Sequence, residues 1–216
     1  MTMKSDTPDE TWTEEELYQL PDRVACLAEI NRRILSESLT DYRKAIDVLL
    51  DAAKRWGDTS TESLLVEDGL LSLIRKNDSF LNQVLDGFTV KDKKTHFLFF
   101  RVVTQLNKKQ IKKSIPLLIS FLMSGEGIAD FEAKVVTFLS GIDDEETNRD
   151  ILTLISPYLS SFNERTVFLA VRIASKIGDS TLIEQMLEVF KKVDRGYFKE
   201  HETPITQSLC AFFKST

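Results

Sequence analysis

The side chains in this sequence that best suit a chemical role are cations gathered in one segment. Between positions 91 and 113 there are eight lysines and arginines against a single acid, Asp92, so this segment has a net charge of +7 in a chain of net charge −6. Like charges four residues apart on a helix destabilise it, and cations near a helix N-terminus oppose its dipole. Such a cluster favours a site for an anionic partner, and its members are Lys91, Lys93, Lys94, Arg101, Lys108, Lys109, Lys112 and Lys113.

Three interpretations of this basic segment stay open. It is a solvated helix end and loop, a surface that binds an acidic segment of another protein, or a surface that binds nucleic-acid phosphates in a salt-dependent way. No aromatic residues of a nucleic-acid motif alternate with the lysines, and the net charge of the chain repels nucleic acid. We therefore expect an acidic protein partner, with nucleic-acid binding as the alternative.

Acidic residues are concentrated in two other places. Residues 1–22 have a net charge of −6 and include Trp12, and we expect residues 1–11 to form a disordered acidic tail that either solubilises the chain or docks on another protein. Thr13 and Glu16 have the spacing of a capping box, which predicts a short helix after the tail. The run Asp143 to Glu146 precedes an apolar stretch, where negative charge suits the positive end of a helix.

The sequence offers little material for catalysis or metal binding. It contains only His96, His201, Cys26 and Cys210 as histidines and cysteines, and it has no P-loop, HExxH or CxxC motif. We expect no enzyme, no cofactor and no metal site; an active site built from scattered carboxylates is the weaker alternative. Two distant cysteines indicate a reducing compartment. With no secretory signal and no apolar run of about 18 residues, we expect a cytoplasmic protein, or a nuclear one in a eukaryote, without membrane insertion.

Apolar residues recur at helical spacing along most of the chain. Stripes between residues 22 and 106 are separated by turn residues, and glycines at positions 57, 87, 141 and 178 fall where the helices should stop. Residues 97–106 are apolar on all sides, which indicates a buried helix, with a strand as the competitor. We predict an all-α fold of nine to eleven helices, in one domain over residues 12–216.

An approximate repeat follows in the second half. An apolar helix from Ile115 and a second one from Phe131 are matched about 36 residues later by helices from Ile151 and Val167, and a third unit follows. The segments IPLLISFLMSGEGIADFEAKVVTFLSGI and ILTLISPYLSSFNERTVFLAVRIASKIGD resemble HEAT repeats, and the likeness is clearest over residues 110–215. Pro116 and Pro157 suit the bent first helices of that family, whereas Asn163 replaces its usual turn aspartate.

This resemblance to HEAT or armadillo-like repeats implies an α-solenoid of antiparallel helix pairs. Proteins of that class act as scaffolds or adaptor subunits, because each repeat contacts its neighbours and the stack presents long surfaces to partners. The expected function is therefore non-catalytic protein binding, with the eight cations named above as the partner-binding residues.

Overall fold

The computed structural model describes residues 13–19, 22–56, 61–124 and 129–215. Over these ranges the chain is all-helical, with no strand, which confirms the predicted fold class. It holds twelve α-helices and two short 3-10 helices there. The expected count of nine to eleven was too low, because even the five-residue helix α1 (Glu14–Tyr18) forms, closed by the predicted capping box of Thr13 and Glu16. The expected tail at residues 1–11 lies outside the described residues.

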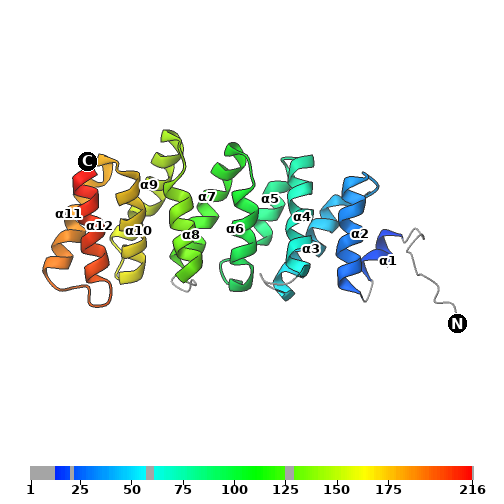
Figure 1. Ribbon diagram of the computed structural model, residues 1–216, viewed down its shortest axis with the longest axis horizontal. Coiled ribbons are helices and arrows are strands. Elements are labelled where there is room, and N and C mark those ends of the chain that lie inside the picture. Colours follow the sequence, from blue (N-terminus) through cyan, green and yellow to red (C-terminus); the bar gives the residue numbers. More distant parts are fainter. Residues whose placement is uncertain (1–12, 20–21, 57–60, 125–128, 216) are drawn as a thin grey trace. The chain divides into compact units, whose positions relative to one another are not determined.

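The chain divides into two compact units, Met1–Gly87 and Phe88–Thr216. The expectation of a single domain over residues 12–216 stays a prediction. After α1 the first unit contains α2 (Arg23–Leu35), α3 (Tyr42–Trp56), α4 (Thr61–Lys76) and α5 (Phe80–Gly87). Helix α4 packs on both α2 and α3, and α3 also contacts α5 (Figure 1). In this unit, therefore, helices separated by one intervening helix in the chain pack together.

A single glycine allows the close packing of α4. A Cβ atom at Gly69 would lie 2.5 Å from Asn31 Oδ1 of α2 and 2.9 Å from Leu49 Cδ1 of α3. No side chain fits at that position without displacement of its neighbours. The helical pattern continues through Gly69 because packing of α4 outweighs the poor helix propensity of glycine.

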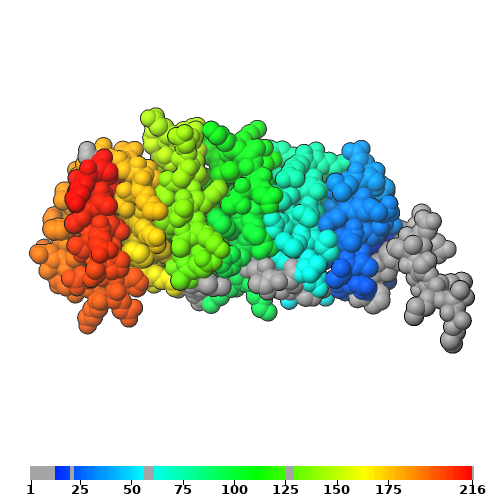
Figure 2. Space-filling model, viewed as in Figure 1, coloured from blue at the N-terminus to red at the C-terminus, as the bar shows by residue number. Residues whose placement is uncertain are grey.

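The second unit contains α6 (His96–Thr104), α7 (Lys108–Met123), α8 (Ala129–Ser140), α9 (Glu145–Leu159), α10 (Glu164–Ile177), α11 (Ile183–Asp194) and α12 (Glu202–Ser215). The 3-10 helices Lys93–Thr95 and Ser180–Leu182 precede α6 and α11. Helices α6, α8, α10 and α12 contact one another in turn, as do α7, α9 and α11. Figure 1 shows these as two rows, and Figure 2 shows α8, α10 and α12 adjacent on one face.

Aromatic rings form the start of the core in the second unit. Phe99, Phe121 and Phe131 are fully buried, and the His96 ring stacks on Phe121 with centroids 4.4 Å apart. The apolar segment is thus a helix through Thr104, two residues short of the expected end at Leu106, and the strand alternative is wrong. Burial lowers the pKa of His96, and this effect outweighs the contact with the Val90 carbonyl, which raises the pKa. The ring is therefore a neutral core residue at pH 7.

Cap residues set the helix boundaries in this unit. Asn107 and Gln110 form a capping box at α7, Asp144 caps α9, and Asn163 caps α10. Gly178 ends α10 with a φ of 71°, as its position in the sequence predicts. Since α7 starts at Lys108, Pro116 lies in the interior of its helix rather than near its start.

Candidate functional site

The basic segment is divided by the α6–α7 hairpin. Because His96 and Phe99 of α6 pack on Phe121 of α7, the two helices run antiparallel. Lys91, Lys93 and Lys94 therefore lie beside the end of α7, whereas Lys108 begins it. The two ends of the 16-residue helix α7 are about 24 Å apart, given a rise of 1.5 Å per residue. Eight cations that are close in sequence do not form one patch; they form two clusters, with Arg101 half-buried between them on α6.

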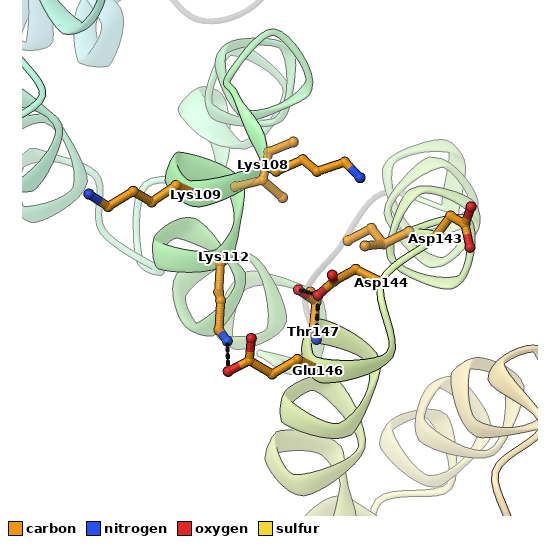
Figure 3. Close-up of a pocket in the computed structure, with 9 residues that line it drawn as sticks. Lys108, Lys109, Lys112, Asp143, Asp144, Glu146 and Thr147 are labelled. Carbon is orange, nitrogen blue, oxygen red and sulfur yellow. Dashed lines mark hydrogen bonds and ion pairs between the residues drawn. The ribbon is translucent and has the colours of Figure 1, made fainter.

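The cluster at the start of α7 faces a groove of about 410 Å³. Lys108, Lys109, Ile111 and Lys112 line one side, and the other side consists of Ile142, Asp143 and Asp144 from the connection between α8 and α9 together with Glu146 and Thr147 from the first turn of α9. Figure 3 shows Lys108 extending toward the loop that carries Asp143 and Asp144, whereas Lys109 extends to the opposite side of α7. Lysines and carboxylates thus share the walls of the groove.

Lys112 is already bound within the chain. Its Nζ lies 2.8 Å from Glu146 Oε1 and 3.0 Å from Asp150 Oδ2, which links α7 to α9. Hydrogen bonds to these two carboxylates raise the pKa of Lys112. The position of the acidic run in the sequence predicts only favourable charge at the start of a helix, whereas the structure also places its Glu146 against Lys112. Asp144 is indeed the cap: hydrogen bonds from Thr147 lower its pKa, and the charges of Lys108 and Lys112 lower it further.

Four of the predicted cations have no ion pair with any described residue. Lys91 and Lys94 are exposed beside α6, and Lys108 and Lys109 are exposed in the first turn of α7. Lys93, Arg101 and Lys113 make other interactions. The net positive charge available to a partner is therefore concentrated on Lys91 and Lys94 at one end of the hairpin and on Lys108 and Lys109 at the other.

A second polar groove, of about 730 Å³, was not predicted. Its walls include Glu132 of α8, Glu164 and Arg165 of α10, and His201 just before α12. Arg165 forms an ion pair with the buried Glu132. Glu132 and Arg165 are 33 positions apart, which is close to the spacing of the approximate sequence repeat. A comparison of equivalent positions in successive units of the sequence could therefore have indicated this pair.

Glu164 holds the start of α12 in place in that groove. Its carboxylate accepts backbone hydrogen bonds from Lys199 at 2.8 Å and Glu200 at 2.9 Å. These bonds lower the pKa of Glu164 despite some desolvation. The His201 ring lies 3.7 Å from the same carboxylate and packs on Phe168. The arrangement is a structural cap, in which the carboxylate supports a turn.

Comparison with protein-family models, with curated proteins and with solved structures found no match to this chain. Within the described residues, no group of three or more histidines, cysteines and acids has a geometry that could hold a metal ion. The same ranges contain no helix that is both long enough and apolar enough to cross a membrane.

Proposed function

We propose that this chain is a non-catalytic scaffold or adaptor built as an α-solenoid of antiparallel helix pairs, similar to HEAT or armadillo repeats, and that it binds an acidic segment of another protein. The supporting observation is that helices separated by one helix in the chain pack together in both units: α2 on α4 and α3 on α5 in the first, and the series α6, α8, α10, α12 and α7, α9, α11 in the second. That pattern is typical of stacked repeats, which contact only their neighbours and leave long surfaces free.

The contact residues we propose are fewer than the eight cations of the basic segment. Lys112 is neutralised by Glu146 and Asp150, and the Asp144 carboxylate is engaged with Thr147. Lys108 and Lys109 remain as charges at the positive end of α7, with Ile111 and Ile142 as apolar surface between them and the acidic loop. Because Lys108 and Lys109 extend to opposite sides of α7, an acidic segment would meet them with separate carboxylates, each near the positive end of the helix dipole.

Lys91 and Lys94 form the second contact in this proposal. An extended chain spans about 3.4 Å per residue, so a segment that reaches both ends of α7 needs at least about seven residues. Two separated contacts of this kind favour an extended acidic segment over a single phosphate or carboxylate.

The test compares the double variant Lys108→Ala/Lys109→Ala with the control Lys176→Ala/Lys214→Ala, which removes two exposed lysines of α10 and α12. Each tagged protein is used for affinity purification from the native source at 0.15 M salt, with quantitative mass spectrometry. We expect a co-purifying protein that is lost with the first variant and kept with the control. If wild type and both variants retain the same proteins in equal amounts, the assignment is wrong.

Nucleic-acid binding is the competing function for the same lysines. The carboxylates of Asp143, Asp144 and Glu146 lie beside the α7 cluster and repel a phosphate backbone. We expect no mobility shift of duplex DNA or single-stranded RNA by micromolar protein at 0.05 M salt. A shift that falls steeply between 0.05 and 0.2 M salt would support the nucleic-acid alternative.

For the compartment we propose the cytoplasm, or the nucleus in a eukaryotic cell. Cys26 is buried and Cys210 is exposed, and both are free thiols. An exposed free thiol is compatible with a reducing environment.

A further inference from the structure

A third groove lies at the end of α11, away from the basic segment. It has a volume of about 240 Å³, comparable to one large aromatic side chain. The connection between α9 and α10 contributes Phe162, the last turn of α11 contributes Lys191 and Lys192, and the segment that follows contributes Arg195 and Tyr197.

Two aromatic side chains beside this groove are exposed. Phe162 is fully exposed, and Tyr197 is 64% exposed. An aromatic side chain that is exposed to water does not gain the favourable free energy of burial. Exposed aromatic residues beside a cavity are typical of binding hot spots. Phe198, the next residue after Tyr197, is buried and anchors this segment to the unit.

The charges around the groove are mostly positive. Lys191, Lys192 and Arg195 face one acid, Glu188, which is bound by Lys191 Nζ at 2.6 Å. That hydrogen bond, with the charges of Lys191, Arg195 and Lys192, lowers the pKa of Glu188. Lys191 and Lys192 also suit the negative end of α11, but this does not account for the exposed Phe162 or for Arg195.

We propose that this groove binds a short acidic segment of a partner protein that carries one aromatic residue. The aromatic side chain packs against Phe162 and Tyr197, and flanking carboxylates face Lys192 and Arg195. Charge complementarity selects the class of ligand, because three cations against the single acid Glu188 leave the groove with net positive charge, which repels a basic peptide and attracts an acidic one. This site does not depend on Lys108 or Lys109, so it stands independently of the contact proposed above.

The test uses a fluorescein-labelled peptide of sequence Glu-Asp-Glu-Trp-Glu-Asp, titrated with the full chain and followed by fluorescence anisotropy at 0.05 and 0.15 M salt. We expect Phe162→Ala to weaken binding at least tenfold and Arg195→Ala to weaken it about threefold, with the Arg195 effect larger at low salt. Replacing the peptide tryptophan by alanine should cause a loss similar to that of Phe162→Ala.

Two matched controls test whether a loss of binding is specific to this groove. Leu35→Ala removes another largely exposed apolar side chain, from the first unit, and Lys176→Ala/Lys214→Ala removes two exposed lysines that do not line the groove; both should bind the peptide as wild type does. Thermal unfolding followed by circular dichroism checks that each variant is folded. Equal affinity of wild type and folded Phe162→Ala, or no binding at millimolar protein, would overturn the proposal. Sedimentation that shows a dimer abolished by Phe162→Ala would assign the groove to a second copy of this chain instead.

Discussion

A partly buried ion pair and an exposed one in the second unit differ in what they contribute to stability. Arg165 is paired with Glu132, whose side chain is 12% exposed, whereas Arg149 is paired with Glu145 at 3.2 Å with both side chains in water. Removing one partner of a desolvated pair leaves the other charge without compensation. An exposed pair four residues apart contributes little.

We therefore expect Arg165→Ala to lower the free energy of unfolding by about 2–3 kcal/mol, and Arg149→Ala to lower it by no more than about 0.5 kcal/mol. Urea denaturation of the two variants measures both values. Equal losses would show that Glu132 is not desolvated in solution.

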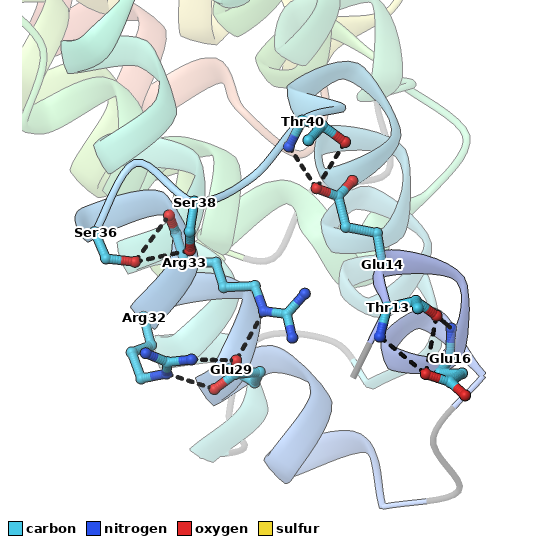
Figure 4. A network of polar contacts seen from close by, with 9 residues as sticks. All are labelled: Thr13, Glu14, Glu16, Glu29, Arg32, Arg33, Ser36, Ser38 and Thr40. Atoms are coloured by element: carbon cyan, nitrogen blue, oxygen red, sulfur yellow. Dashed lines mark hydrogen bonds and ion pairs between the residues drawn. The ribbon is translucent and has the colours of Figure 1, made fainter. Parts of the chain in front are cut away.

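Glu14 of α1 forms hydrogen bonds with the residues just before α3. Its carboxylate accepts hydrogen bonds from Thr40 N and Oγ1 (Figure 4), and it also accepts one from Asp41 N. Burial alone would raise the pKa of Glu14, but the hydrogen bonds from Thr40 and Asp41 outweigh it, and the pKa is lowered. The ionised carboxylate is thus the form that stabilises this contact.

This lowered pKa predicts a pH dependence of stability. The contribution of Glu14 is complete above its unfolded pKa of about 4.3 and is lost as the pH falls through the lower folded pKa. Glu14→Gln should be less stable than wild type at pH 7, and the difference should shrink below about pH 4. Urea unfolding at pH 7 and pH 3 gives both differences. A constant difference across this range would contradict the ionised contact.

At the scale of elements, the tight crossing of α4 with α2 and α3 depends on Gly69. Alanine is favoured over glycine in a helix by about 1 kcal/mol, but its Cβ would meet Asn31 and Leu49. We expect Gly69→Ala to destabilise the chain by about 1–3 kcal/mol, and the exposed neighbour Asp68→Ala to be nearly neutral. Thermal unfolding of both variants is the measurement. A more stable Gly69→Ala variant would show that α4 can shift without cost.

Most elements could be predicted from the sequence because local signals agree along it. The capping box at Thr13, the apolar period of α7 and the glycine after α10 all reflect interactions within a few residues. The start of α7 was placed too late, because its first turn is made of lysines rather than apolar residues. Cap residues such as Asn107 were the better indicator of where that helix begins.

The site was harder to predict, for a physical reason. Proximity in sequence suggested one basic patch, but the antiparallel hairpin places Lys91 and Lys108 at opposite ends. The carboxylates that pair with Lys112 come from α9, which a single sequence gives no means of placing against α7. The sequence therefore shows which cations the basic segment contains. Its separation into two clusters and the pairing of Lys112 with carboxylates depend on tertiary packing.

At the scale of the whole molecule, the second unit has a core of its own. Phe99, Phe121, Phe131 and Phe212 are fully buried within residues 88–216. We expect a fragment of residues 88–216 to show a helical circular dichroism spectrum and a cooperative thermal transition, because its helices pack mainly on helices of the same unit. A fragment that is unfolded at 25 °C would show that its stability requires the first unit.

Substantial helix contacts within the described ranges join helices no more than three positions apart in the chain. Structure of this kind can form as the polypeptide is synthesised, since each helix has its packing partners available soon after it leaves the ribosome. A nascent chain halted after a few helices would therefore already hold much of its final arrangement, without waiting for the carboxyl terminus.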